Sequence, residues 1–209
     1  SLRSWGDCLA SRDWARNGLK IAPGLIVVDS GWLPDLVYRL VSERGWMASR
    51  GLGGSINVRQ YRPPRPGVRG IRHGDGWYTK IHQDFRVQVL YPDGNRWKRE
   101  IQSGLMAPID DDQTISLFKG SQKEHETFAA HVTAEVEEQA FSEKGGVKQV
   151  WRQLKPDNHY LDCLVMSRAG ANYLGVSGLT APQRAKLQMT RNYEPAKKKE
   201  EGGAWKIGR

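Results

Sequence analysis

The sequence predicts an α/β domain, and three observations support this. An apolar run with β-branched residues ends in an acidic residue at Val27-Val28-Asp29, an amphipathic helix follows it directly, and a second amphipathic helix carries Asp162 near its start. The 209 residues fit one domain with or without a tail. Ligands of open α/β sheets collect at the carboxyl ends of strands, so the position of Asp29 indicates a site.

The first 45 residues are predicted to form helix, strand, turn and helix. Residues 1–18 have an apolar face that predicts a helix, and residues 25–28 are typical of a central strand buried on both faces. Ser30-Gly31 turns the chain. Pro34 suits the first position of a helix, and Gly45 suits its end.

The segment 48–100 is rich in Gly, Pro and Arg, and we interpret it as a basic insertion of hairpins and loops. Residues 50–99 contain eleven Lys and Arg against three Asp, with aromatic residues interleaved. Strand signals at 85–91 are followed by a turn signal at 92–95. This composition favours a nucleic-acid surface, the alternative being a solvated loop region.

An acidic segment follows. It predicts a short strand at 115–118 and a helix from Glu124 to the Gly145-Gly146 pair, because apolar residues recur every four positions as far as Ala140. A further strand is expected at 147–154. The last predicted helix starts after Asp157 or Asn158, either of which suits the cap. Its apolar stripe is formed by Leu161, Leu164, Val165 and Ala169.

The net charge of +9 favours a polyanionic partner, which for this feature alone includes nucleic acid, the ribosome and lipid. Residues 179–209 are expected to form a basic, flexible tail behind a domain at 1–178. No apolar run is long enough to span a bilayer and no signal peptide is recognised, which predicts a cytosolic protein. The glycine-rich stretch 51–54 lacks the Lys-Ser/Thr of a phosphate-binding loop, and Cys8 and Cys163 lack zinc-site spacing.

Asp29 and Asp162 are the candidate metal ligands. Each carboxylate alone has a structural alternative, since Asp29 can cap a turn and Asp162 can pair with an arginine. Together in one basic α/β chain they favour a bound Mg²⁺ or Mn²⁺, which prefers carboxylate oxygens. His159 precedes Asp162 by three positions on the same helix face, where it can polarise water, contact a phosphate or cap the helix.

Two stretches resemble the large terminase subunit of lambda-like tailed bacteriophages. Val27-Val28-Asp29-Ser30-Gly31-Trp32, followed by Val37-Tyr38, resembles that family's DSGY…VY signature. The segment 158–165 resembles its C-terminal N-x-x-LDC-x-V motif, and weaker similarities lie at Trp97-Lys98 and 128–135. The resemblance covers residues 1–175.

The resemblance implies a ribonuclease H-like nuclease domain, a mixed sheet flanked by helices. It implies cutting of concatemeric double-stranded viral DNA in the host cytoplasm, with two Mg²⁺ or Mn²⁺ ions, Asp29 and Asp162 as ligands and His159 in support. It also implies an ATPase domain, a small terminase subunit and the portal as partners. Residues expected to hold the DNA backbone are Arg50, Arg59, Arg62, Lys80, Arg86 and Lys98.

The sequence departs from the family in two respects. The family's ATPase motor is absent from it, and one expected metal ligand is missing. The family's first metal-binding Asp lies on an opening strand, and no such strand precedes Asp29 here; it could lie on another chain, be cut away or be lost. Two other functions therefore stay open. One is a non-catalytic DNA-binding or assembly module, and the other is a different ribonuclease H-like enzyme such as a resolvase or integrase. Oligomeric state is left open by the sequence.

Overall fold

The computed structural model describes residues 2–12, 14–16, 19–21, 23–54, 59–142 and 146–176. The chain falls into two compact units. The first contains α1 (Leu2–Ser11) and an antiparallel pair formed by β1 (Trp14–Arg16) and β2 (Leu19–Ile21). The predicted helix at 1–18 is thus confirmed only for α1. It is wrong for 14–16, which form β1 and pair with β2.

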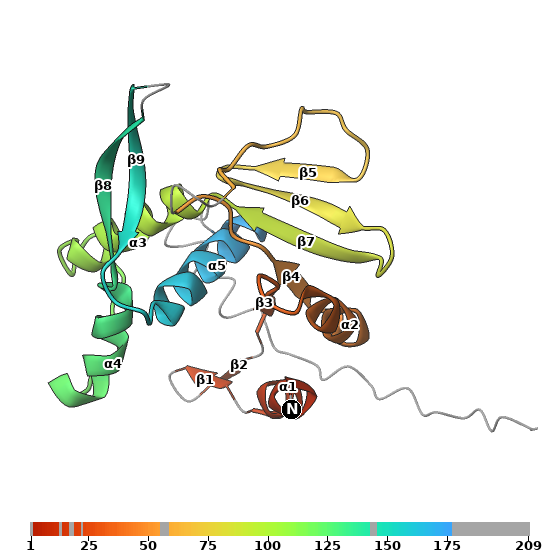
Figure 1. The fold of residues 1–209 in the computed structure, drawn as a ribbon. Coiled ribbons are helices and arrows are strands. Elements are labelled where there is room, and N and C mark those ends of the chain that lie inside the picture. Colours follow the sequence, from red (N-terminus) through yellow and green to blue (C-terminus); the bar gives the residue numbers. More distant parts are fainter. Residues whose placement is uncertain are drawn as a thin grey trace, which may run out of the picture. The chain divides into compact units, whose positions relative to one another are not determined.

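The second unit is built on a five-stranded mixed sheet with the order β3-β4-β7-β6-β5 (Figure 1). Its strands are β3 (Val27–Asp29), β4 (Met47–Ser49), β5 (Ile71–Gly74), β6 (Trp77–His82) and β7 (Val87–Pro92). The first two are parallel to each other and to β7, whereas β5, β6 and β7 form an antiparallel meander. A mixed sheet flanked by helices confirms the predicted fold class and is consistent with a ribonuclease H-like fold.

β3 lies at the edge of this sheet among the described strands, not at its centre. Val27 and Val28 are only half-buried. The expectation of a strand buried on both faces is therefore wrong, because a fully apolar run does not reveal how many neighbours a strand has.

Helices cover both faces of the sheet. α2 (Pro34–Arg44) lies on one face, where the Tyr38 ring is 4.6 Å from His82 and 5.6 Å from Phe85. It begins at Pro34 and ends at Gly45, whose φ of 66° is left-handed, as predicted. α3 (Gly94–Met106) and α5 (His159–Tyr173) cover the other face. The core between them and the sheet consists of Met47, Trp77, Leu90, Trp97, Ile101, Leu161, Val165 and Ala169.

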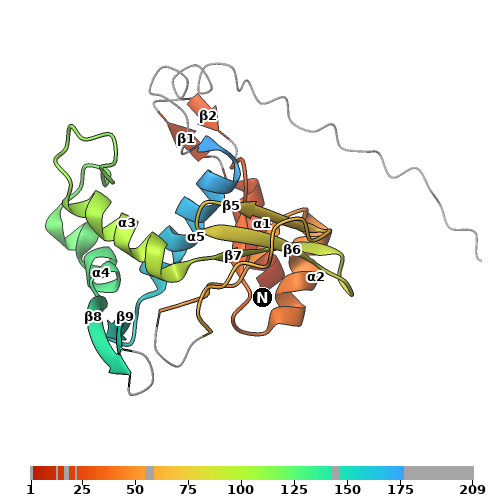
Figure 2. The same cartoon turned by 90° about the horizontal axis from the view of Figure 1, so that it is seen from above.

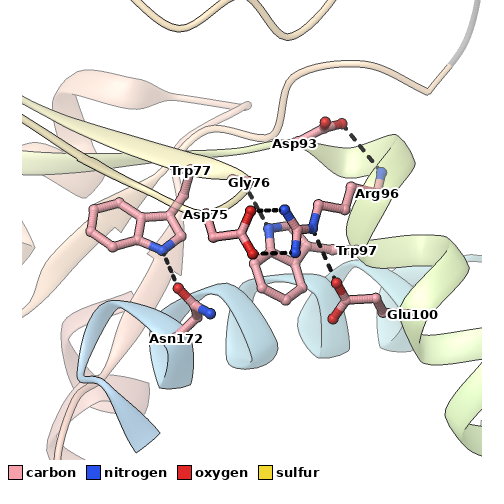
Figure 3. Close-up of polar contacts among 8 residues, drawn as sticks. All are labelled: Asp75, Gly76, Trp77, Asp93, Arg96, Trp97, Glu100 and Asn172. Carbon is pink, nitrogen blue, oxygen red and sulfur yellow. Dashed lines mark hydrogen bonds and ion pairs between the residues drawn. The ribbon is translucent and has the colours of Figure 1, made fainter. Parts of the chain in front are cut away.

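α3 replaces the predicted turn at 92–95. The Asp93 carboxylate caps the helix by accepting the Arg96 N–H at 3.2 Å, so an Asp-Gly-Asn signal that suits a turn serves here as a helix start (Figure 3). Arg96 then reaches the carboxylate of Asp75 in the β5–β6 turn and Glu100 one turn along α3. The Trp97 indole N–H donates to the Gly76 carbonyl at 2.8 Å. These bonds fasten the hairpin to the helix.

β6 is tied to α5 in a similar way. The Trp77 indole N–H donates to Asn172 Oδ1 at 2.7 Å (Figure 3). The Trp77 ring also packs edge-on against Tyr173, with centroids 5.3 Å apart. The hairpins expected within 48–100 are present as β5–β6 and β6–β7. They are not an insertion beside the fold, because β6 and β7 belong to the main sheet and Trp77 to its core.

The acidic segment forms α4 (Gln122–Val132) and a separate hairpin of β8 (Glu135–Ser142) and β9 (Gly146–Gln153), next to α3 and away from the sheet (Figure 2). The predicted helix is correct to Val132 and wrong beyond it. A four-residue recurrence also fits a strand, since four is a multiple of its two-residue period. Residues 115–118 have no regular structure, so that predicted strand is wrong, whereas the one at 147–154 is confirmed.

The predicted tail at 179–209 and the domain limit at 178 lie outside the described residues. In the part of the chain that the structure describes, no helix has the length and apolar character needed to cross a membrane.

Candidate functional site

Asp29 ends β3, and the turn that follows is fixed by backbone bonds. The N–H and hydroxyl of Ser30 both donate to the Ser49 carbonyl at 2.8 Å, which closes β3 onto β4. The Gly31 N–H donates to Asp29 Oδ1 at 3.2 Å. A Cβ at Gly31 would lie 3.2 Å from Asp29 Oδ2, so a glycine there leaves room for the exposed carboxylate.

α5 brings Asp162 towards the same end of β3. The helix packs closely on the strand because Gly170 has no side chain; a Cβ there would lie 3.4 Å from Leu25 Cδ2 and from Val27 Cγ2. Asp162 lies in the first turn of α5, and its side chain is 50% exposed. The predicted stripe beside it is confirmed, since α5 buries Leu161, Val165 and Ala169.

The charges around Asp162 show which groups converge. Burial raises the pKa of Asp162 above its ordinary value, and the carboxylates of Glu135 and Asp29 raise it further. Lys98 and His159 act in the opposite direction. The two carboxylates selected from the sequence are therefore near enough to repel each other, although 133 positions separate them in the chain.

Lys98 is not on the surface where sequence reasoning placed it. The residue is 8% exposed, and its Nζ lies 2.6 Å from Glu135 Oε2 and 3.9 Å from Asp162 Oδ1. Its ammonium thus belongs to the surroundings of Asp162. Contact with a DNA backbone would require it to leave a buried ion pair.

His159 lies at the rim of this region. Its side chain is 74% exposed, and its Nε2 lies 3.6 Å from Asp157 Oδ1. The ring also meets His131 edge-on, with centroids 5.7 Å apart. The structure therefore places His159 beside Asp162 but shows it in contact with Asp157 and His131.

The other residues predicted to contact DNA are exposed, and Arg50 and Arg59 lie near Tyr91 on the α2 face of the sheet. On that face Tyr78 stacks on Tyr91 with centroids 4.8 Å apart. Arg59 and Arg50 both lower the pKa of Tyr91 against the rise caused by burial, which places them nearby. Arg62, Lys80 and Arg86 are exposed in the loop before β5, on β6 and in the β6–β7 turn. Ser49 precedes Arg50 in the chain, so its side chain points to the opposite face of the sheet, the face covered by α5. Asp29 is paired in register with Ser49 and therefore lies on that α5 face as well.

Three residues near the carboxylates were not predicted from the sequence to belong to the site, although Asn158 was a candidate cap of α5. Glu135 is 7% exposed and accepts a hydrogen bond from the Asn158 side chain. Asn158 holds the cap position of α5, but its amide is used for this bond and not for the helix. Ser49 is fully buried. The stretch 128–135 carried only a weak resemblance, and nothing local marks Glu135 as the partner of a lysine 37 residues away.

The residues present fit an oxygen-preferring divalent cation. Asp29 is exposed and Asp162 half-exposed, so both carboxylates are accessible to a ligand. The Ser49 hydroxyl, in register with Asp29, is buried with no hydrogen-bond partner among the described residues. Those same residues contain no group of three or more His, Cys, Asp or Glu side chains suited to a metal. The two available donors are carboxylates, and their hard oxygen atoms suit Mg²⁺ or Mn²⁺ better than a soft metal.

Comparison with known proteins gives one family. Neither a search of curated proteins nor one of solved structures finds a match. The family model described as "Terminase large subunit gpA, endonuclease domain" matches residues 7–185, which is most of the chain and includes both Asp29 and Asp162. The chain therefore belongs to the family of terminase large subunit gpA endonuclease domains, nucleases of viral DNA packaging.

Proposed function

We propose that this domain is a Mg²⁺- or Mn²⁺-dependent endonuclease that cuts concatemeric double-stranded DNA during packaging. One observation carries the proposal: the strand end at Asp29 and the helix start at Asp162 converge, so that the charge of Asp29 raises the pKa of Asp162. Two carboxylates held this way, one of them partly desolvated, favour a cation between them.

The roles of the residues follow from their positions. Asp29 and Asp162 would hold the cation, and Gly31 would keep the Asp29 carboxylate in place through its N–H. A bound divalent cation supplies Lewis-acid chemistry, which polarises the phosphoryl group and makes bound water acidic, and a pair of ions would stabilise both attacking and leaving oxygens. His159, exposed at the rim, would contact a phosphate or orient a water molecule.

DNA would be held mainly through its backbone. The exposed residues Arg50, Arg59, Arg62, Lys80 and Arg86 would contact phosphates, which gives binding that tolerates sequence and weakens with salt. We leave Lys98 out of this set because it is buried. The ATPase domain, small subunit and portal are proposed partners in the host cytoplasm.

The test is plasmid cleavage with Mg²⁺ or Mn²⁺ by wild type, Asp29→Asn and Asp162→Asn. Asp84→Asn is the matched control, because Asp84 is an exposed carboxylate in the β6–β7 turn. Wild type and Asp84→Asn should cut, whereas both site variants should lose at least about 100-fold in rate while still shifting DNA on a gel. Equal cutting by all four proteins would contradict the proposal.

A second candidate is a DNA-binding or assembly module without catalysis. The lack of a three-ligand group among the described residues favours it. It predicts that wild type shifts DNA with or without Mn²⁺, cuts under neither condition, and binds equally well after Asp29→Asn. The same experiment therefore separates the two functions.

A further inference from the structure

Lys98 and Glu135 form a buried ion pair next to Asp162. The exposed fractions of their side chains are 10% and 7%, and Nζ lies 2.6 Å from Oε2. Burying two charges costs several kcal/mol of desolvation, and the mutual attraction repays it only where further hydrogen bonds satisfy the pair. The surroundings of this pair supply such bonds.

Glu135 is bonded to the start of α5 as well as to Lys98. The Asn158 side-chain N–H donates to Glu135 Oε1, while the Asn158 carbonyl accepts from the N–H groups of Leu161 and Asp162, at 2.8 and 3.3 Å. Gln102 on α3 adds a bond to the Glu135 carbonyl at 3.3 Å. One carboxylate therefore links α3, β8 and the turn of helix that carries Asp162.

Lys98 is held away from Asp162 by this arrangement. Its Nζ is hydrogen-bonded to Glu135, lies 5.7 Å from the centroid of the Trp151 ring, and stands 3.9 Å from Asp162 Oδ1. At 3.9 Å the ammonium attracts the carboxylate without forming a good hydrogen bond to it. Asp162 therefore has a fixed positive charge beside it while its oxygens stay available.

We propose that Glu135 is a positioning residue of the nuclease site and acts through its contacts with Lys98 and Asn158. Glu135 binds the ammonium so that it does not occupy Asp162, and through Asn158 it fixes the turn from which Asp162 projects. The inference rests on the proposed function, because it assigns the pair a task only if Asp162 binds a cation. Partners that orient metal ligands typically change metal affinity or activity about 10- to 100-fold when they are replaced.

The test compares wild type with Glu135→Gln and with Lys98→Met/Glu135→Gln. A glutamine keeps an acceptor for Asn158 and removes only the charge. The matched control is Arg99→Met/Glu137→Gln, which removes the neighbouring Arg99–Glu137 pair (2.9 Å) between the same two elements, α3 and β8. Three quantities are measured: the melting temperature, the affinity for Mn²⁺ alone by electron paramagnetic resonance, and kcat and KM for plasmid cleavage.

Glu135→Gln frees Lys98 to pair with Asp162, so its Mn²⁺ affinity should fall about 10- to 100-fold. The double variant should stay folded, because replacing a buried pair by neutral groups is often close to neutral for stability. Because it has no ammonium that could pair with Asp162 and keeps an acceptor for Asn158, its Mn²⁺ affinity and kcat should return to within about threefold of wild type, with KM for DNA changed by no more than that. The control variant should keep wild-type values of all three quantities.

A Glu135→Gln variant that binds Mn²⁺ and cuts like wild type would overturn the inference and leave the pair a purely structural one, and so would a folded double variant that is as weak as Glu135→Gln. If the double variant does not fold, Glu135→Gln below its melting temperature decides: unchanged Mn²⁺ affinity overturns the inference, and a lowered one supports it. A wild type that neither binds Mn²⁺ nor cuts would refute the proposed function, and the inference with it. If wild type binds Mn²⁺ and cuts, the proposed function stands, and the variants then test only the role of Lys98 and Glu135.

Discussion

The turn after β3 gives a sharp prediction about the site, the effect of Gly31→Ala. An alanine Cβ would lie 3.2 Å from Asp29 Oδ2, which is tighter than an ordinary van der Waals contact, and 3.5 Å from Oδ1, which is an ordinary one. The backbone at Gly31 does not require a glycine, because its φ is not in the left-handed region. The carboxylate must therefore move by a few tenths of an ångström while the fold stays intact.

The magnitude follows from the sensitivity of catalysis to position. A misplacement of about 1 Å can cost about 100-fold in rate, so a shift of a few tenths should slow cleavage about three- to tenfold, or raise the barrier by about 1 kcal/mol. Stability should change by less than about 1 kcal/mol and in the favourable direction, because alanine restricts the unfolded chain. The assay is Mn²⁺-dependent plasmid cleavage, with thermal unfolding measured on the same samples.

Gly51→Ala is the matched control. Gly51 is exposed two residues after β4, its φ is also not left-handed, and an added Cβ would meet nothing within 4 Å. It should leave the cleavage rate and the melting temperature near wild type. If Gly31→Ala cuts as fast as Gly51→Ala, the Asp29 carboxylate is not held where the structure places it or does not take part in the reaction.

Three further predictions concern the core and the site. Gly74→Ala should destabilise the domain by at least about 2 kcal/mol in urea unfolding, because a Cβ there would overlap the Trp77 ring at 2.0 Å; an unchanged midpoint would show that the hairpin adapts freely. Asn172→Leu should cost about 1–3 kcal/mol by leaving the buried Trp77 indole N–H unpaired, and a Trp77→Phe background should remove most of that cost. Asp162→Asn should abolish cleavage yet stabilise the metal-free protein at neutral pH, by only about 0.5 kcal/mol because solvent screens a half-exposed group. Since the pKa of Asp162 is raised on folding, its ionised form lowers the stability of the folded protein. The stability gained from asparagine should therefore shrink as pH falls through that raised pKa and vanish below about pH 4, where aspartate is protonated in the unfolded chain as well. Thermal unfolding in the presence of a chelator measures this.

Local signals predicted the part of the fold that depends on local chemistry. Proline at the first helical position and a left-handed glycine at the end fixed α2 correctly from Pro34 to Gly45. The apolar run before Asp29 correctly placed a strand end there, and the stripe on α5 correctly placed its buried face. Each of these depends on a few adjacent residues, so the sequence contains the whole cause.

Errors arose where a local pattern fits two structures. The recurrence that continues from Val132 to Ala140 suits one face of a helix and one face of a strand equally, and pairing with β9 decides for a strand. Asp93-Gly94 suits a turn or a helix start, and the docking of Arg96 and Trp97 on the β5–β6 turn favours the helix. Both decisions are tertiary, so no reading of the segment alone could make them.

The site shows the same division. Asp29 and Asp162 were selected as candidates because carboxylates at a strand end and at a helix start are recognisable in the sequence. Lys98 was assigned to the surface because the segment around it is rich in Lys and Arg. Its burial depends on Glu135, which is distant in sequence and reaches it only when β8 packs against α3. Charge composition describes a segment, but the partner of an individual charge is set by the fold.

Under the proposed function, the distribution of charge would separate two steps of DNA recognition. The net charge of +9 attracts a polyanion to the molecule as a whole. Around Asp162 the local balance is reversed, because Asp29, Asp162 and Glu135 outnumber Lys98, whose ammonium is already paired. A phosphate therefore gains from the basic residues at long range but is repelled at the carboxylates unless a cation neutralises them. We expect DNA affinity in chelator to depend steeply on salt, and added Mn²⁺ to change cleavage far more than affinity.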